Sequence, residues 1–470
     1  MGMKRWLDRL GAGLQARPYR FLALFAILAN LILICNPGYY NHDEWQRYDT
    51  IVAKGFPFYM RTYGSLRVGA TFGTPIRPLG FFEEGLTARW MPSDPALLHG
   101  IDVLLHMLIA LAMLRALLVC GLARPAAVLA AFIFCLSPLA MLATGWTAAS
   151  FDQWYVLFTL TGVIVGMRIV QQGATGVRLL ALLLASTAAM LSKETAMAVP
   201  MALAGCAVAV ALLRGEPVRW WRVLLVGTIA ALPVCAYLVI RAPALMRSLA
   251  MAAGPYKPGF GHVLPNLLAY LEYPFLPRLG ETVSIVLVPE PLRMAALLAH
   301  LVLLGLLAFA INWKAALAYL FAYLVFLLPV LSIPGTGSHY LNASALALSA
   351  ALAALIVLPR RNLTGTIVRA LACLALALTT WHAIFLQTSI RRDGVCQRNF
   401  LTDLDSAMAT AAADGQKVGV VRFRPGTRTY MGSRSIFGRK QYDGIHFVVL
   451  LPATVPGPHE LLMDASCHVH

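Results

Sequence analysis

The hydrophobic positions of this chain fall into long blocks separated by short polar segments. Several blocks approach or reach the ~20 residues that a helix needs to cross a hydrocarbon core of about 30 Å. Clear examples are Leu179–Leu191, Val223–Ile240, Met294–Ile311, Ala315–Ile333 and Ala343–Leu358. The pattern therefore predicts a chain that crosses a membrane many times.

Basic residues between the blocks predict the orientation. Five of them precede the first block at Phe21–Cys35, which the positive-inside rule places in the cytoplasm. No small-x-small cleavage site follows that block, so we expect a retained helix rather than a signal peptide. Alternate crossings from there predict about eleven helices, with a basic residue in every cytoplasmic connection. The predicted helices are residues 21–36, 97–118, 126–143, 152–169, 178–192, 194–213, 222–240, 292–311, 315–333, 343–358 and 364–387.

Composition agrees with the membrane class. Hydrophobic residues make up 59% of the 470 positions and charged residues 13%, against ~25% charged in soluble domains. The formal net charge of +17 could suggest nucleic acid, but the basic residues are dispersed between apolar blocks. We interpret them as topology signals and predict membrane lipids, and no nucleic acid, as partners.

We expect an all-α polytopic membrane domain over residues 1–387 and a small extracytoplasmic α/β domain over residues 388–470. An odd helix count places the second domain in the periplasm, if the membrane is a bacterial inner membrane. Two further segments are long enough to build structure outside the bilayer, namely residues 37–96 and residues 241–291. The first is rich in Gly, Pro, Arg and aromatic residues, which is typical of a loop that handles a ligand.

The second outer loop and the tail have simpler patterns. Gly254–Gly259 is a turn-forming run suited to a mobile lid, and Leu267–Phe275 suits an interfacial helix. The tail predicts a polar helix near Asn399–Ala413 with strands near Lys417–Phe423 and His446–Leu451.

Eight cysteines are present, and two of them, Cys396 and Cys467, lie in the tail. Because the predicted topology places the tail in an oxidising compartment, we expect a disulfide between them. The alternative is two unrelated free thiols.

Acidic residues follow the outer ends of two predicted helices. Asp43 and Glu44 come shortly after the first helix, and Asp152 begins the helix at 152–169, so all three emerge on the same membrane face. Converging carboxylates can act as a general base for an acceptor hydroxyl, and Asp43 with Asp152 can bind a divalent cation such as Mg or Mn. The alternatives are solvated loop charges and, for Asp152, a favourable position at a helix N-terminus.

Four short motifs add to the acidic residues in a fixed order along residues 40–345. They are Arg77-Pro78-Leu79, the set His99, Asp102 and His106 on one helix, Ser192-Lys193-Glu194, and His339-Tyr340-Leu341.

Together these motifs resemble those of the GT-C glycosyltransferases, and among them the transmembrane-and-TPR and protein O-mannosyltransferase group. The corresponding elements of that group are R-P-L, H-x-x-N-x-x-L-H, C-K-E and R-Y-L-Y. This chain has Asp102 in place of Asn, His339 in place of Arg, and no TPR repeats. The resemblance implies a GT-C fold and a lipid-phosphate-linked sugar donor.

The polar motifs suggest different roles. His99, Asp102 and His106 fall on one helical face, where they either bond between helices or line a cavity, and we favour the structural role. Lys193, a cation at an outer helix end, suits a polyprenyl phosphate or diphosphate. Further candidates for the donor phosphate are Arg77, Arg241, Lys257 and Arg278, although such cations are often solvated or structural.

The sequence thus predicts an inverting glycosyltransferase that moves a sugar from a polyprenyl-phosphate donor to a hydroxyl of a glycan, lipid or protein acceptor. The alternatives are a transporter or flippase for a lipid-linked saccharide, which would favour internal repeats, and an enzyme similar to the O-antigen ligases.

Overall fold

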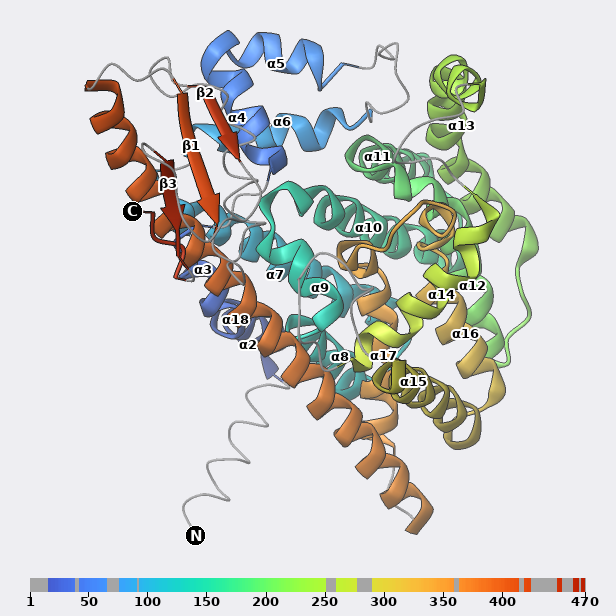
Figure 1. Cartoon of the computed structure of the whole chain (residues 1–470). Helices are drawn as coiled ribbons and strands as arrows, with labels where there is room; N and C mark the ends of the chain where they lie inside the picture. Colours follow the sequence, from blue (N-terminus) through green and yellow to red (C-terminus); the bar gives the residue numbers. More distant parts are fainter. Residues whose placement is uncertain are drawn as a thin grey trace.

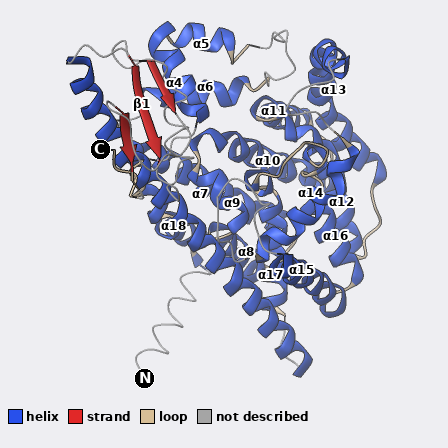
Figure 2. Ribbon diagram, in the orientation of Figure 1, coloured by secondary structure: helices blue, strands red, loops and turns tan. Residues whose placement is uncertain are grey.

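A computed structural model gives the arrangement of the chain, and the residues that it describes are mostly helical (Figures 1 and 2). The described residues are 16–38, 42–65, 76–90, 93–250, 259–276, 290–358, 363–413, 418–423, 446–449, 460–464 and 466–469.

Within these ranges, six helical segments are long and apolar enough to cross a membrane, and a bent pair of helices adds a seventh. The six are Pro95–Val119, Thr147–Gln172, Glu194–Arg214, Trp220–Pro243, Pro291–Ala310 and Leu363–Ala407. Shorter apolar helices cover Pro18–Ala29, Gly176–Ser192 and Ser344–Val357. The chain is therefore a multi-pass membrane protein, and the count of eleven crossings stays a prediction.

Three predicted helices differ in the structure. The helix predicted at 315–333 ends at Leu324, and turns and the 3₁₀ helix η6 (Leu328–Val330) follow it. The other two are broken. The range 21–36 is divided into α2 (Pro18–Ala29) and α3 (Leu31–Ile34) at Asn30, whose amide donates to the carbonyls of Ala26 and Cys135. The range 126–143 becomes α8 (Arg124–Cys135) and α9 (Pro138–Gly145), which meet at an angle of 50°. Proline has no N–H to continue the α8 hydrogen-bond ladder, so the break falls just before Pro138.

The core of the bundle lies between α8, α7 (Pro95–Val119), α10 (Ser150–Gln172) and α17 (Ser344–Val357). Ala127, Ala130 and Ala131 of α8 are fully buried. Such small side chains let the α8 and α17 backbones approach closely, which is how helices associate in a medium as apolar as their own surfaces.

The short turn predicted at Ser192-Lys193-Glu194 is present. α11 (Gly176–Ser192) ends at Lys193, whose backbone is extended, and the 3₁₀ helix η3 (Glu194–Ala198) leads into α12 (Val199–Arg214). The next helix, α13 (Trp220–Ala250), is longer than the predicted 222–240.

The first outer loop is largely helical. It contains α4 (His42–Lys54), α5 (Phe56–Thr62), α6 (Pro78–Thr87) and the 3₁₀ helix η1 (Ala88–Trp90). In Figure 1 these helices lie together at the end of the molecule that also holds the small sheet.

The second outer loop contains η4 (Phe260–His262), α14 (Val263–Glu272) and η5 (Tyr273–Phe275), so the predicted interfacial helix begins before Leu267. Residues 254–258 of the predicted lid lie outside the described residues. The remaining elements before the tail are α15 (Glu290–Ala310), α16 (Trp313–Leu324), η6 (Leu328–Val330) and η7 (Ser338–Leu341).

The tail differs from the prediction in its helix and in one strand. The helices predicted at 364–387 and 399–413 form one continuous helix, α18 (Leu363–Ala413), of 51 residues. The apolar pattern ends near residue 387, but no proline interrupts the polar half, so the helix continues toward the small sheet (Figure 1).

Three parallel strands, β1 (Val418–Phe423), β2 (His446–Val449) and β3 (Glu460–Met463), form a sheet of order β2-β1-β3. β1 and β2 lie close to the predicted strands, and β3 was not predicted.

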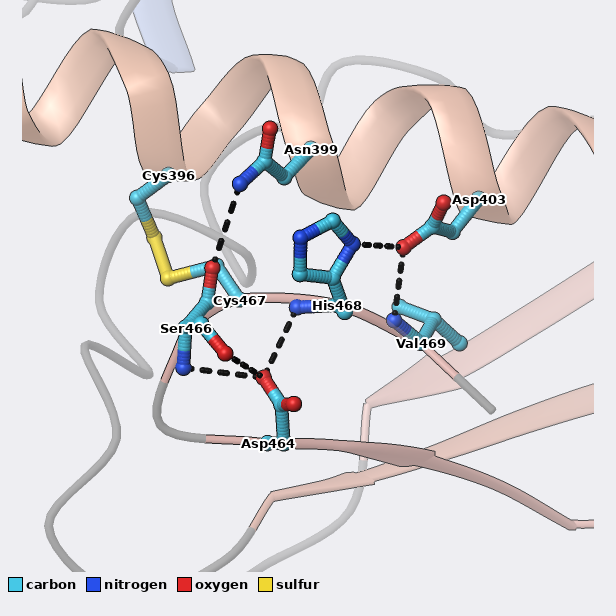
Figure 3. Close-up of a disulfide and its surroundings, with 8 residues drawn as sticks. All are labelled: Cys396, Asn399, Asp403, Asp464, Ser466, Cys467, His468 and Val469. Carbon is cyan, nitrogen blue, oxygen red and sulfur yellow. Dashed lines mark hydrogen bonds and ion pairs between the residues drawn. A yellow bond between two sulfur atoms is a disulfide. The ribbon is translucent and has the colours of Figure 1, made fainter.

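The last described segment is attached to α18 (Figure 3). Cys396 and Cys467 form a disulfide, and Asp403 of α18 accepts hydrogen bonds from His468 Nδ1 at 2.7 Å and from the backbone N–H of Val469 at 3.0 Å. Leu33 and Val103 of the bundle share a buried cluster with Cys396, Cys467 and other residues of α18 and the tail. The disulfide thereby fixes the end of the tail to α18, and apolar packing joins the tail to the helix bundle.

Candidate functional site

A buried ion pair forms the centre of the candidate site. Lys193 Nζ lies 2.5 Å from Asp152 Oδ2, and the two side chains are 4% and 1% exposed. Asp152 stands in the first turn of α10, and Lys193 separates α11 from η3. Asn342 Nδ2 donates to the backbone carbonyl of Asp152 at 3.1 Å. Two buried charges are tolerated because each neutralises the other.

A second ion pair lies beside the first and is more exposed. Arg77, at the start of α6, donates through Nε to Glu194 Oε2 at 2.7 Å and through Nη2 to Glu194 Oε1. The two side chains are 17% and 33% exposed. The contact is bidentate, which fixes the orientation of the guanidinium as well as its position.

Aromatic side chains surround these charges. Lys193 Nζ lies 4.5 Å from the ring centroid of Tyr340. His339 contacts the rings of Tyr340, at 4.1 Å, and Trp146, at 5.3 Å between centroids. Burial lowers the pKa of His339 well below its usual value, so its imidazole is neutral at pH 7. We call the group Arg77, Asp152, Lys193, Glu194, His339 and Tyr340 the charged site.

The charged site therefore joins four segments that are distant in sequence. Three of the four motifs that resemble glycosyltransferase elements contribute to it, and Asp152 supplies the fourth segment. Lys193 and Arg77, which we expected to bind a donor phosphate, both pair with carboxylates here.

The fourth motif lies elsewhere, inside the bundle. His99 Nε2 lies 2.9 Å from the carbonyl oxygen of Gly38, Thr147 Oγ1 donates to Asp102 Oδ2 at 3.1 Å, and the ring of His106 stacks on Phe134. All three motif residues are buried. These contacts join α7 to neighbouring segments, and the structural role of the three residues stays a prediction.

The sequence interpretation missed a second acidic pair, on α6. Glu84 pairs with Arg47 and accepts a hydrogen bond from Tyr59 Oη at 2.9 Å. Glu83 accepts one from Ser150 Oγ at 2.8 Å, and burial raises the pKa of Glu83 to about 7. The signal was two adjacent carboxylates in the same outer loop as Asp43 and Glu44.

Asp43 and Glu44, the predicted catalytic pair, belong to α4, but their side chains lie outside the described part of the structure. The α4 backbone packs against α6 and against η2 (Thr147–Ala149), the turn just before α10. Among the described residues no group of three His, Cys, Asp or Glu is placed to hold a metal ion. The predicted pairing of Asp43 with Asp152 at a metal stays a prediction.

The other predicted phosphate ligands are less well placed. Arg241 is half-buried on α13, a helix that packs against η3. Lys257 and Arg278 lie outside the described residues.

Comparisons with known proteins add little to this geometry. No protein-family model matches the chain, and no curated protein does. Among solved structures, the chain is similar to the arabinofuranosyltransferase AftD from mycobacteria, with 16% identity and a TM-score of 0.34. The similarity covers 87% of this chain and 31% of that structure, so the chain spans about a third of its length. At this TM-score neither a fold nor an activity follows from the similarity.

Proposed function

We propose that this chain is a membrane glycosyltransferase that moves a sugar from a polyprenyl-phosphate-linked donor to an acceptor hydroxyl. The observation that carries the proposal is the charged site, in which two cations and two carboxylates from distant segments meet at the ends of apolar helices. Ionisable residues are costly at such positions and are retained mainly where they act on a ligand.

The cations suit the leaving group of this reaction. When an acceptor oxygen attacks the anomeric carbon, negative charge develops on the departing phosphate, and preorganised cations there lower the barrier. Arg77 and Lys193 supply that charge in the mechanism that we propose. The Tyr340 ring packs against Lys193 Nζ, and His339 packs against that ring.

The acceptor must also lose a proton. We assign this role to Asp43 or Glu44, because α4 packs beside α6 and η2 and so lies close to the segments that carry Arg77 and Asp152. A phosphate leaving group needs no strong general acid, so one carboxylate base is sufficient for a single inverting displacement.

We assign no step to a metal ion, because the ammonium of Lys193 already neutralises Asp152. Dependence on Mg or Mn is tested by chelation. We further propose that transfer takes place on the outer face of a bacterial inner membrane, with the N-terminus cytoplasmic and the C-terminus periplasmic. Reporter fusions at residue 470 and at Arg222 test this orientation.

The test of the function is transfer of labelled sugar from polyprenyl-phosphate donors by purified protein in lipid nanodiscs. Asp43→Asn keeps the size of the side chain but removes its basicity, so we expect turnover to fall by about 10²–10⁴-fold. Glu44→Gln is the parallel variant, because either residue can be the base. Normal turnover in both variants, or flipping of a lipid-linked saccharide without transfer, would contradict the proposal. Mass spectrometry of envelope glycans from cells with and without the chain then identifies the acceptor.

A further inference from the structure

The two ion pairs of the charged site differ in how easily they can open. The side chains of Lys193 and Asp152 are 4% and 1% exposed, whereas those of Arg77 and Glu194 are 17% and 33% exposed. When a buried ion pair opens, no water can solvate the charge that remains, whereas water can solvate a charge near the surface. Arg77 is therefore the cation of this site that an incoming anion reaches first.

The carboxylate of Glu194 binds Arg77 in the way a phosphate would. It accepts from Nε and Nη2, two N–H groups on one edge of the guanidinium. The same edge binds two phosphate oxygens in phosphate sites. Glu194 thus lies where the ligand of Arg77 would lie.

The charges of the site also favour exchange over simple addition. Arg77 and Lys193 are balanced by Asp152 and Glu194, so an anion that arrives while both pairs are closed meets no net positive charge. Once Glu194 moves away, one positive charge becomes available. A phosphate monoester carries about −1.5 to −2 charges at pH 7 and can outcompete one carboxylate, whereas a phosphodiester carries a single charge and gains less.

We propose that Glu194 is a place-holder carboxylate for polyprenyl phosphate, the monoester that a glycosyl transfer releases. It holds Arg77 in the resting protein, leaves when the lipid phosphate binds, and returns to help expel the product. The identity of the lipid rests on the proposed function, but the exchange at Arg77 does not require sugar transfer.

The experiment measures binding of farnesyl phosphate to the purified full-length protein in detergent by calorimetry, with farnesol as the blank. Glu194→Gln keeps the length of the side chain and removes its charge. Because charge-assisted hydrogen bonds are about twice as strong as neutral ones, we expect affinity to rise by about tenfold. Phosphatidylglycerol, a diester, should gain less.

The chain offers a matched control. Glu272 of α14 accepts from Nε of Arg293 at 2.7 Å and from Nη2 at 3.4 Å, in a comparable bidentate pair outside the charged site. Glu272→Gln should leave the affinity for farnesyl phosphate unchanged. Adding Arg77→Lys to Glu194→Gln should abolish the gain, because lysine lacks the two-pronged edge.

If Glu194→Gln does not fold, Glu194→Asp serves instead. Its carboxylate is one methylene shorter and bonds Arg77 less well, so the expected rise is a few-fold. Unchanged or weaker affinity in the folded variant would overturn the place-holder role. If Glu194→Gln binds farnesyl phosphate more tightly but the protein transfers sugar from no donor, the glycosyltransferase proposal is refuted and the place-holder role stands. If the protein transfers sugar but the variant shows no gain in affinity, the place-holder role is refuted and the glycosyltransferase proposal stands.

Discussion

The charged site and the polar stripe of α7 both place ionisable residues among apolar helices, but they handle them differently. The charged site holds four full charges in two ion pairs, and one pair is open to the surface. The α7 stripe uses a carbonyl, a hydroxyl and an aromatic ring as partners for His99, Asp102 and His106, and all three residues are buried. The first arrangement can exchange a partner for a ligand, whereas the second joins helices.

The largest expected effect concerns the buried pair. Lys193→Ala leaves Asp152 without its cation, which should destabilise the protein by about 3–5 kcal/mol. The double variant Lys193→Met with Asp152→Asn removes both charges and should recover most of the stability while remaining inactive. Thermal unfolding in detergent, followed by size-exclusion chromatography, measures both. A single variant as stable as the wild type would show that the pair contributes nothing to the fold.

Substitutions in the α7 stripe should lower the stability of the protein but not its sugar-transfer activity. Asp102→Ala removes the acceptor of the Thr147 hydroxyl and should cost about 1–3 kcal/mol of stability. Asp102→Asn keeps an acceptor there and should cost less. Sugar transfer per folded molecule should be unchanged in both. A loss of turnover in folded Asp102→Asn would place the stripe in the functional site and remove the distinction between the two regions.

Glu83 should make the stability of the protein depend on pH. Its pKa rises from the ordinary 4.5 to about 7, so the folded protein favours the protonated carboxyl. The contribution of Glu83 to the free energy of unfolding is fully present below pH 4.5 and is lost as pH rises through about 7. After allowance for partial exposure, we expect this loss to be about 1–3 kcal/mol. Unfolding measured from pH 5 to 8 should show this slope in the wild type, and Glu83→Gln should flatten it. Equal slopes would mean that Glu83 is ionised throughout.

The smallest expected effect concerns the ring beside Lys193. Tyr340→Leu removes the aromatic face that lies 4.5 Å from Nζ and should cost about 0.5–2 kcal/mol, while Tyr340→Phe keeps the ring and should cost less. Thermal unfolding of the two variants gives the difference. If leucine and phenylalanine behave alike, Tyr340 acts through packing and not through its interaction with the cation.

The sequence by itself determined the features that depend on residues close to one another along the chain. Runs of apolar residues specify helices wherever a membrane is the solvent, so the turn at Lys193 and the start of α10 near Asp152 were both predictable. The pairing of Cys396 with Cys467 was an expectation drawn from topology, and the structure has that disulfide. The break before Pro138 also has a local cause, but hydropathy alone does not reveal it, because the residues on both sides are apolar.

Only the tertiary structure decided which side chains meet. Arg77 and Glu194 are 117 positions apart, and Lys193 and Asp152 are 41 apart, so no periodicity in the sequence relates them. Their pairing follows from the packing of α6, α10 and α11, which brings these opposite charges together. A buried charge is stable only beside such a partner. The same packing buries Glu83 beside Ser150 and raises its pKa, although its sequence context is that of an ordinary loop carboxylate. Hydropathy is a sum over neighbours along the chain, whereas electrostatic pairing depends on distance in space.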